Sequence, residues 1–357
     1  MGYTTVLDRS GAVGAAALLA ESQSARAGGG FASGLLVDQV MAEAGVVEPG
    51  IARLALDQAD GDLARAVSLI RAWSAVLPRH APSRAGWEEL VCRRRITPGF
   101  AGPRGGQYLG ASRDYAQRLL DLSPLSQAPV EAEESEPVPE EPTANGHQAP
   151  SSFPRATGSI DREGLVAEPR PRAGAQDVTR TPAHGYDRGV LLQLLSRAES
   201  GALVALGYTG IRGNGRQDPT LLELRSGTLP VRMRRPGGGT FTLGQVPAVL
   251  VEMGGYRLHG GQVDAALTIG VGATPGRLER RAIAAAVLDA GCARAATDPP
   301  DRREPCEDAE FLTIALDGQE ASGFVEHLKL PHHVTFTSEL DRIRQARSAR
   351  RVEPSAS

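Results

Sequence analysis

Three of the chain's seven histidines lie in one short segment near the C-terminus, GFVEHLKLPHH: His327, His332 and His333. A neutral imidazole nitrogen is a good ligand for a divalent transition metal, so this grouping indicates a metal site. If residues 323–330 form a strand, Pro331 turns the chain and His332 or His333 can approach His327. The alternative is a set of hydrogen-bonded surface or interface histidines.

The sequence leaves the remaining ligands of such a site open, because two histidines alone leave a metal incompletely coordinated. The candidates are His333, a carboxylate such as Asp308 or Glu310, a substrate oxygen, and a residue of another chain. Lys329 lies between the histidines and is the only lysine in the chain. Unless that position is a coincidence, its compact ammonium group indicates a contact with a phosphate oxygen.

Two glycine-rich segments could bind phosphate. Residues 207–216 read GYTGIRGNGR, and residues 270–276 read GVGATPG and lead into a predicted helix. Free glycine backbone lets amide groups converge on an anion, and a helix start adds its dipole. The cationic candidates are Arg212, Arg216, Arg277 and, in the motif DVTRTP, Arg180. The alternative is tight turns with solvated arginines and, for Arg180, a helix entry.

The elements that must position these residues indicate an α+β fold. We predict a helical N-terminal domain at 1–122, a disordered Pro/Glu-rich linker at 123–176, a mixed α/β domain with the His/Lys site at 177–346, and a tail at 347–357. Apolar residues at three- and four-residue steps mark the helices of the first domain, with a last short helix from about Arg113. The linker has too few large apolar groups to offset the entropy of ordering.

Within the α/β domain, hydrophobic runs predict the individual elements. We predict strands at 202–208, 221–233, 248–253, 265–271, 311–318 and 323–330. We predict helices at 190–195 and 278–287, and a charged helix from about Ser338 to the C-terminal end.

Composition excludes several classes of protein. With 39 basic and 42 acidic residues the net charge is −3, which gives no excess for coating nucleic acid. The three cysteines, Cys92, Cys292 and Cys306, are widely spaced, which fits a reducing compartment rather than a disulfide framework or thiolate cluster. No apolar run approaches the roughly 18 residues that span a bilayer. We expect a cytoplasmic protein with no nucleic-acid or membrane partner.

The segment GFVEHLKLPHH, with Asp308 and Phe311 before it, closely resembles the C-terminal signature of the I subunit of the carbon–phosphorus lyase core complex, the PhnI family. Further similar segments follow in the same order: GGQYLG, DYAQRLLDL, DVTRTP, YTGIRGNGR, RSG and ERRAIAAAVLD. The resemblance covers nearly everything outside the predicted linker and the extreme termini. At His333 relatives often carry an aromatic residue, so the resemblance carries over to His327 and His332 only.

The resemblance implies a subunit of a complex that lets bacteria use phosphonates, with the G, H, J, L and K subunits as partners. It implies that methylphosphonate displaces adenine from ATP to give α-D-ribose 1-methylphosphonate 5-triphosphate, and that the subunit alone is a purine nucleosidase. The histidines matching His327 and His332 would bind zinc near the contact with the J subunit, a radical S-adenosylmethionine enzyme.

Losing adenine passes through a ribosyl cation, so the site must protonate the leaving base and gather cations around the triphosphate and the alkylphosphonate. Lys329 and the metal would bind phosphate or phosphonate oxygens, while the arginines above would bind the triphosphate; the general acid stays unassigned. The alternative is a non-catalytic scaffold that positions the J subunit. An unrelated zinc hydrolase is disfavoured because HExxH is absent.

Overall fold

The structure is a computed structural model of the chain. It describes residues 34–78, 86–110, 153–167, 176–180, 187–213, 219–235, 237–256, 258–259, 262–263, 265–296 and 298–352. Three predictions lie outside these residues: the helix from about Arg113, the phosphate candidate Arg216 and most of the predicted linker.

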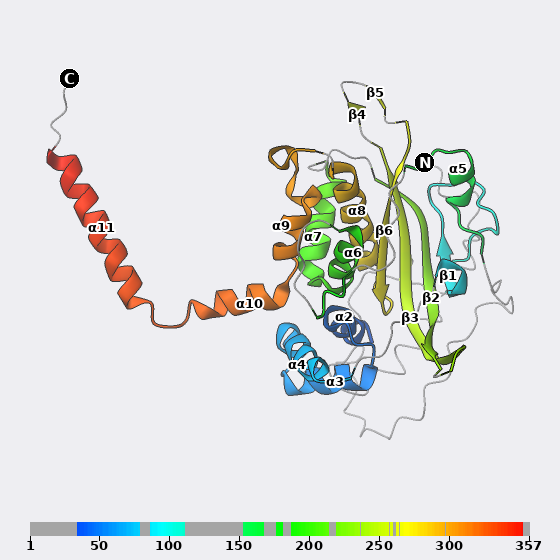
Figure 1. The fold of residues 1–357 in the computed structure, drawn as a ribbon, viewed down its shortest axis with the longest axis horizontal. Helices are drawn as coiled ribbons and strands as arrows, with labels where there is room; N and C mark the ends of the chain where they lie inside the picture. Colours follow the sequence, from blue (N-terminus) through cyan, green and yellow to red (C-terminus); the bar gives the residue numbers. More distant parts are fainter. Residues whose placement is uncertain are drawn as a thin grey trace, which may run out of the picture.

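The centre of the molecule is an antiparallel sheet with the strand order β1-β2-β3-β6 (Figure 1). Its strands are β1 Val91–Ile96, β2 Thr220–Arg234, β3 Thr240–Gly255 and β6 Thr268–Pro275. A small separate hairpin pairs β4 Leu258–His259 with β5 Gln262–Val263. The strands predicted at 221–233 and 248–253 are confirmed, and so is the α+β class. The strand predicted at 265–271 is present but begins at Thr268 and continues to Pro275.

A layer of helices covers one face of the sheet (Figure 1). It consists of α6 Arg188–Arg197, α7 Ser200–Ile211, α8 Glu279–Ala295 and α9 Ala309–Ala315. The apolar residues Val249 and Val251 of β3 pack against Ala282 and Ala286 of α8. The predicted helices at 190–195 and 278–287 are therefore confirmed as α6 and α8.

Helix α8 approaches the sheet closely because β6 has glycines at the contact. A Cβ added to Gly270 would overlap the carbonyl oxygen of Ala286, and one added to Gly272 would overlap that of Ala282. The glycines of the segment 270–276 are thus part of a strand, where they allow backbone packing. The prediction that they form a phosphate-cradling loop is wrong for these two residues.

Three helices form a second group at one end of the sheet: α2 Gly34–Ala44, α3 Pro49–Gln58 and α4 Leu63–Ala75. They enclose their own apolar cluster, which includes Val40, Met41 and Ile70. Buried Glu43 joins this group to the helical layer, since its carboxylate accepts hydrogen bonds from the backbone and hydroxyl of Ser200. The helices predicted in this region are confirmed.

The prediction that residues 1–122 are helical throughout is wrong at β1. This strand pairs with β2, with Val91 opposite Thr228 and Ile96 opposite Leu224. Its side chains alternate between buried and exposed at its start, which is a β pattern that the helical spacing of the neighbouring segments concealed. The first part of the chain therefore completes the sheet of the second part.

Residues 153–167 lie within the predicted disordered linker, and there the prediction is also wrong. They form helix α5 Gly158–Arg162, and Phe153, Ala156 and Thr157 are buried. The segment lies on the sheet face opposite α8 and binds charged groups of the sheet, which offset the entropy of ordering it. The other domain boundaries stay predictions.

Three predicted strands are helices instead. Residues 202–208 belong to α7, 311–318 fall mostly in α9, and 323–330 fall largely in α10 Gly318–His327. An acidic N-cap precedes each helix, as Glu199, Asp308 and Asp317 accept hydrogen bonds from the first backbone amides. Those caps fix helical geometry in apolar runs that are too short to show a period.

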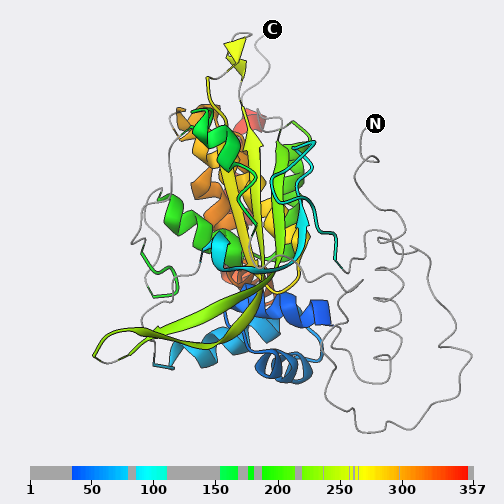
Figure 2. The same ribbon diagram turned by 90° about the vertical axis from the view of Figure 1, so that its right-hand side faces the viewer.

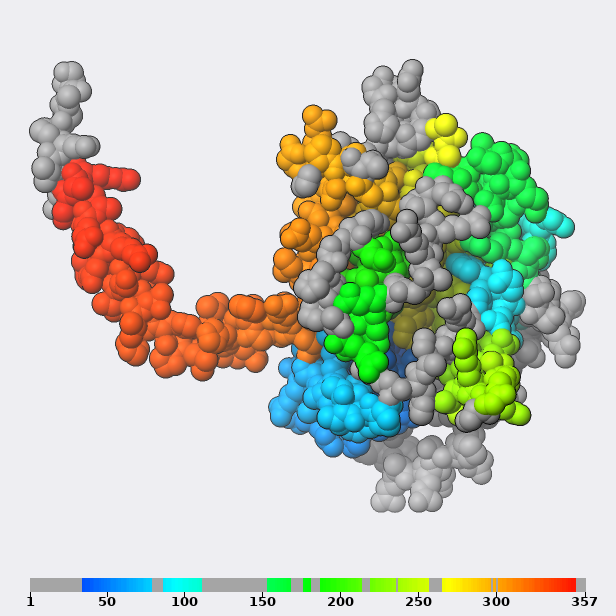
Figure 3. Space-filling view, viewed as in Figure 1, coloured from blue at the N-terminus to red at the C-terminus, as the bar shows by residue number. Residues whose placement is uncertain are grey.

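The C-terminal part forms an arm that leaves the body (Figures 1 and 3). The arm consists of α10, a turn and α11 His333–Val352, which confirms the predicted C-terminal helix and starts it five residues earlier than Ser338. Its connection to the body includes Gln319, whose amide donates to the carbonyl oxygen of Ala64 in α4. No helix in the described ranges is long and apolar enough to cross a bilayer.

Candidate functional site

The histidine pair lies in the turn between the two helices of the arm. Helix α10 ends at His327, and the amide of Leu330 then closes a turn onto the carbonyl oxygen of His327. Pro331 has no amide hydrogen to continue the helix, so the chain changes direction and α11 begins at His333. The predicted strand is therefore replaced by a helix–turn–helix, which still brings two of the three histidines together.

The rings of His327 and His332 contact each other edge to face. Their centroids are 5.0 Å apart and their planes make an angle of 71°. The Nε2 atom of His332 lies 3.2 Å from the carbonyl oxygen of His327. Because a carbonyl can only accept, Nε2 carries the proton in this contact and Nδ1 is the nitrogen left for a metal.

The pair supplies at most two ligands from the arm. Within the described part of the chain, no group of three or more His, Cys, Asp or Glu side chains is placed to hold a metal. Asp308 caps α9 instead, accepting hydrogen bonds from the amides of Glu310 and Phe311. Two imidazoles fit half of a tetrahedral zinc set, so this donor pair suits a metal only if other groups complete it.

Lys329 lies in the same turn and is largely free to bind a ligand. Its side chain is 77% exposed, and its ammonium nitrogen is 3.5 Å from a carboxylate oxygen of Glu326. An exposed ion pair of this kind contributes little stabilising free energy, so an anionic ligand can replace the Glu326 carboxylate at Lys329 at small cost. The lysine thus carries an exposed positive charge in the turn that contains the two histidines, and its contact with a phosphate oxygen stays a prediction.

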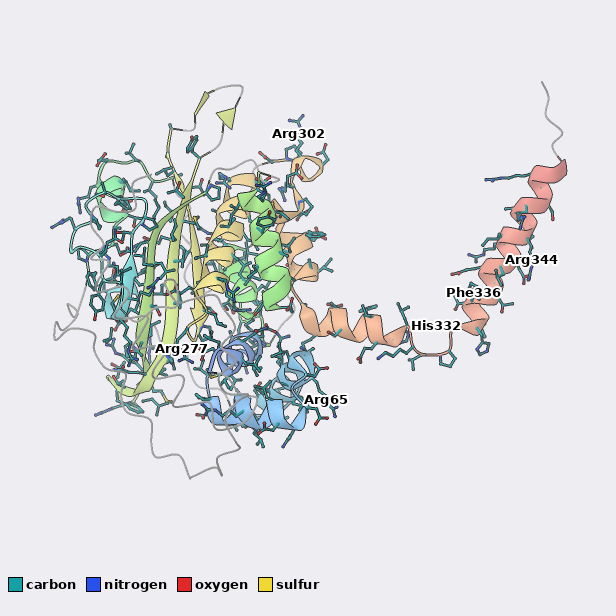
Figure 4. The ribbon with its side chains drawn as sticks, turned by 180° about the vertical axis from the view of Figure 1, so that it is seen from behind. Arg65, Arg277, Arg302, His332, Phe336 and Arg344 are labelled. Atoms are coloured by element: carbon teal, nitrogen blue, oxygen red, sulfur yellow. The ribbon has the colours of Figure 1, made fainter. Side chains whose placement is uncertain are left out.

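The arginine candidates are spread over the body. Arg277 precedes α8 and lies well away from His332 (Figure 4). Its Nε is 2.8 Å from the carboxylate of Asp38, which also accepts from the Arg277 amide at 3.0 Å. A carboxylate of the chain itself therefore occupies the position before α8 at which the sequence predicted a phosphate.

Arg212 and Arg180 are exposed and lie in other places. Arg212 follows the last turn of α7, where its amide donates to the carbonyl oxygen of Tyr208. Arg180 closes a turn onto Asp177. The structure does not bring these two arginines to the histidine pair by any contact among the described residues.

A buried charged network on the sheet face opposite α8 is absent from the sequence predictions. The carboxylate of Glu223 receives Nε of Arg95 at 2.6 Å and Nε of Arg225 at 2.9 Å, with all three side chains almost completely buried. The amide of Ala156 donates to the same carboxylate at 2.9 Å. Two opposite charges two residues apart in an apolar strand, as in LLELRSG, are the sequence signal for this network.

The same network binds the segment 153–167 through a second buried carboxylate. Glu252 pairs with Arg155 and accepts the hydroxyl of Thr157 at 2.8 Å. The Trp87 ring lies under the guanidinium groups of Arg155 and Arg225 at 5.7 and 5.5 Å. Burial lowers the pKa of Arg155, although nearby carboxylates oppose this effect. Apart from Nη2 of Arg225, which is buried without a hydrogen-bond partner among the described residues, these groups bind one another, so we assign the network to positioning the segment.

A third buried carboxylate joins α6 to the sheet. Asp289 of α8 binds the guanidinium of Arg188 at 2.6 and 2.9 Å and accepts from the amide of Val271 at 2.7 Å. Burial raises the pKa of Asp289, while these hydrogen bonds lower it. This carboxylate is therefore engaged in structural contacts as well.

Fold and site together define an α+β protein with an exposed arm whose candidate ligand pair is incomplete within the described chain. The chain belongs to the PhnI family, described as bacterial phosphonate metabolism proteins, whose family model matches residues 29–350. It is 34% identical over 327 residues to the putative C-P lyase subunit protein HtxH of Stutzerimonas stutzeri, covering 90% of this chain and 86% of that protein.

Two relatives are named alpha-D-ribose 1-methylphosphonate 5-triphosphate synthase subunit PhnI. The one from Rhizobium meliloti (strain 1021) is 35% identical over 320 residues, covering 88% of this chain and 84% of the relative. The one from Escherichia coli (strain K12) is also 35% identical over 320 residues, covering 87% and 86%.

Proposed function

We propose that the chain is a subunit of a cytoplasmic carbon–phosphorus lyase complex that makes α-D-ribose 1-methylphosphonate 5-triphosphate. In this reaction methylphosphonate displaces adenine from C1′ of ATP. The similarity to two synthase subunits over nearly the whole chain carries the proposal. The proposed partners are the G, H, J, L and K subunits of the complex.

The surface of the arm supports assembly with other subunits. Phe324, Leu328 and Phe336 are 70%, 74% and 59% exposed, which is unusual for large apolar side chains carried on one projecting element. Covering them with another subunit would remove apolar surface from water and could bring further ligands to the histidine pair. Figure 3 shows that the arm projects away from the body of the molecule.

The residues of this chain would act on the anionic groups of the substrates. Lys329 binds a phosphate or phosphonate oxygen as a point charge, and Arg212, Arg216 and Arg180 bind the triphosphate. His327 and His332 would hold a divalent metal, for which we propose zinc, and the metal when bound would polarise an anionic oxygen. Because a bound cation lowers the charge repulsion between methylphosphonate and ATP, each of these residues would favour attack at C1′ when it binds its anion.

The second candidate function is a scaffold that positions the J subunit. The observation in its favour is that His327 and His332 form an incomplete ligand set on an exposed arm. A scaffold of this kind would place the pair at an interface, with no contact to the reacting atoms.

The test is adenine release from ATP by the complete co-expressed complex with methylphosphonate present, measured by chromatography. If the chain is catalytic, Lys329→Ala and Arg212→Ala lower the rate at least about tenfold while subunit composition stays unchanged. Arg65→Ala, on exposed α4, is the matched control and should keep the rate. Full activity in both variants would favour the scaffold, and no adenine release by the wild-type complex would refute the catalytic proposal.

A further inference from the structure

Strands β2 and β3 continue beyond the sheet as a two-stranded ribbon, residues 229–235 and 237–246. The last β2 residue paired with β1 is Thr228, and the last β3 residue paired with β6 is Ala248. Among the described residues, β2 and β3 pair only with each other past these points, and the ribbon projects from the body toward the lower left of Figure 2. A two-stranded ribbon in water is at best marginally stable, so its length needs another reason.

The ribbon carries positive charge without any carboxylate. From residue 224 to residue 251 the sequence contains no Asp or Glu, while Arg232, Arg234 and Arg235 lie near the end of β2. Arg232 pairs with Glu89, and the guanidinium of Arg235 lies 5.8 Å from the Phe241 ring centroid. Among the described residues neither Arg234 nor Arg235 forms an ion pair, and Arg234 and Arg235 are exposed.

In the part of the chain that the structure describes, neither edge of the ribbon is paired with another strand. Only one of the two edges carries residues that block the addition of a further strand. The β2 edge contains Pro230 and the arginines, and proline and charge are the devices that block strand addition. The β3 edge, residues 240–246, has neither. A β-bulge lies between the pairs Val231–Gly244 and Arg232–Thr242, so Leu243 has no partner residue on β2. The Leu243 residue is 65% exposed.

We propose that the ribbon is a docking site for an acidic, extended polypeptide segment of another subunit, added along the β3 edge. Its backbone would pair with residues 240–246, its carboxylates would bind Arg234 and Arg235, and an apolar side chain would cover Leu243. A row of unpaired backbone groups beside an apolar anchor fits a polypeptide better than a nucleic acid. This inference rests on the proposed membership of a multisubunit complex.

The first experiment compares hydrogen exchange of the wild-type chain alone and in the co-expressed complex. Amides of 240–246 should exchange at least about tenfold more slowly in the complex, because backbone pairing protects them. Exposed helix α3 residues provide an internal reference. Equal exchange of 240–246 in the two samples would overturn the proposal, whatever the activity of the complex.

The second experiment tests charge with the double variant Arg234→Glu/Arg235→Glu. In tagged complexes washed at 0.3 M NaCl, we expect the variant to retain at least about fivefold less of one partner subunit than wild type. The double variant Arg53→Glu/Arg65→Glu, on exposed positions of α3 and α4, is the matched control and should retain all subunits. Because all four side chains are exposed, both variants should melt at the wild-type temperature, which would show that the fold is intact.

The outcomes separate this inference from the proposed function. A complex that assembles and releases adenine with an unprotected ribbon refutes the inference alone, and a chain that joins no complex refutes both. Binding of a 20-mer oligothymidylate that is lost in the ribbon variant, with no loss of a subunit, would identify a nucleic-acid site and overturn the inference.

Discussion

The ring of His332 lies edge-on to the ring of His327, with centroids 5.0 Å apart and the His332 Nε2 3.2 Å from the His327 carbonyl oxygen. The two residues come from the end of α10 and the residue before α11, so any ligand bound by both rings connects the two helices of the arm. Binding at this turn would reduce the freedom of α11 relative to α10. Occupancy of such a site would therefore be coupled to the orientation of the arm.

The histidine pair predicts a specific pattern of zinc binding. His327→Ala and His332→Ala should each lower the zinc content of the purified complex at least about tenfold, because one remaining imidazole cannot hold the ion. Zinc content is measured by mass spectrometry of the metal after dialysis. His333→Ala is the matched control, since the ring contact found among the described residues joins only His327 and His332, and equal loss in all three variants would contradict the two-ligand arrangement.

Arg277 should affect stability rather than nucleotide binding. Its guanidinium and its amide both donate to the buried carboxylate of Asp38, and Arg277→Ala removes the guanidinium contact only. With the Arg277 side chain 43% exposed, we expect a loss of about 1 kcal/mol in the free energy of unfolding. Urea unfolding measures this loss. A raised KM for ATP with unchanged stability would instead restore Arg277 to the phosphate site.

Sequence patterns predict the long elements well and the short ones badly. The strand at 221–233 and the helix at 278–287 carry enough apolar residues to show their period, and both are present as β2 and α8. Residues 202–208 and 323–330 contain about two helical turns each, too few to distinguish a helix from a strand. The caps Glu199 and Asp317 decide these cases, and their hydrogen bonds to backbone amides depend on local geometry.

In the candidate site, too, contacts between residues close in sequence are predicted, whereas contacts between residues far apart in sequence are not. His327, Lys329 and His332 are close in sequence, so their proximity survives the change from strand to helix–turn–helix. The partner of Arg277 could not be predicted, because Asp38 lies 239 residues away in the chain. The buried ion pair of Arg95 and Glu223 is equally non-local, and sequence composition alone had placed its neighbour segment in a disordered linker.

Gly272 tests the close packing of α8 on the sheet. Gly272→Ala places a Cβ on the carbonyl oxygen of Ala282, which is backbone and cannot rotate away, so α8 must shift. We expect a loss of about 2 kcal/mol or more in the free energy of unfolding, measured with urea. Gly323→Ala is the matched control because it lies in α10 with open space around it, and it should stabilise the helix by about 0.5–1 kcal/mol. Equal stability of the two variants would show that α8 and β6 are farther apart.

The buried cysteines predict a loss of stability at alkaline pH. Burial raises the pKa of Cys92 from 9.0 to about 11 and also raises the pKa values of Cys292 and Cys306. Because the folded state holds these protons more tightly than the unfolded state, their contribution is fully present below about pH 8.5 and is lost as pH rises toward 11. For Cys92 alone the loss amounts to at most about 3 kcal/mol.

The measurement is urea unfolding of the wild type and Cys92→Ala at pH 8, 9 and 10. The variant should be less stable at pH 8, because the thiol packs in the core, but should lose less stability between pH 8 and pH 10. In the native protein at pH 8, Ellman's reagent should react with the three thiols at least about a hundredfold more slowly than in urea. Rapid reaction of one thiol in the native state would place that cysteine at the surface. If the free energy of unfolding fell equally with pH in the wild type and in Cys92→Ala, Cys92 would not be a source of the alkaline loss.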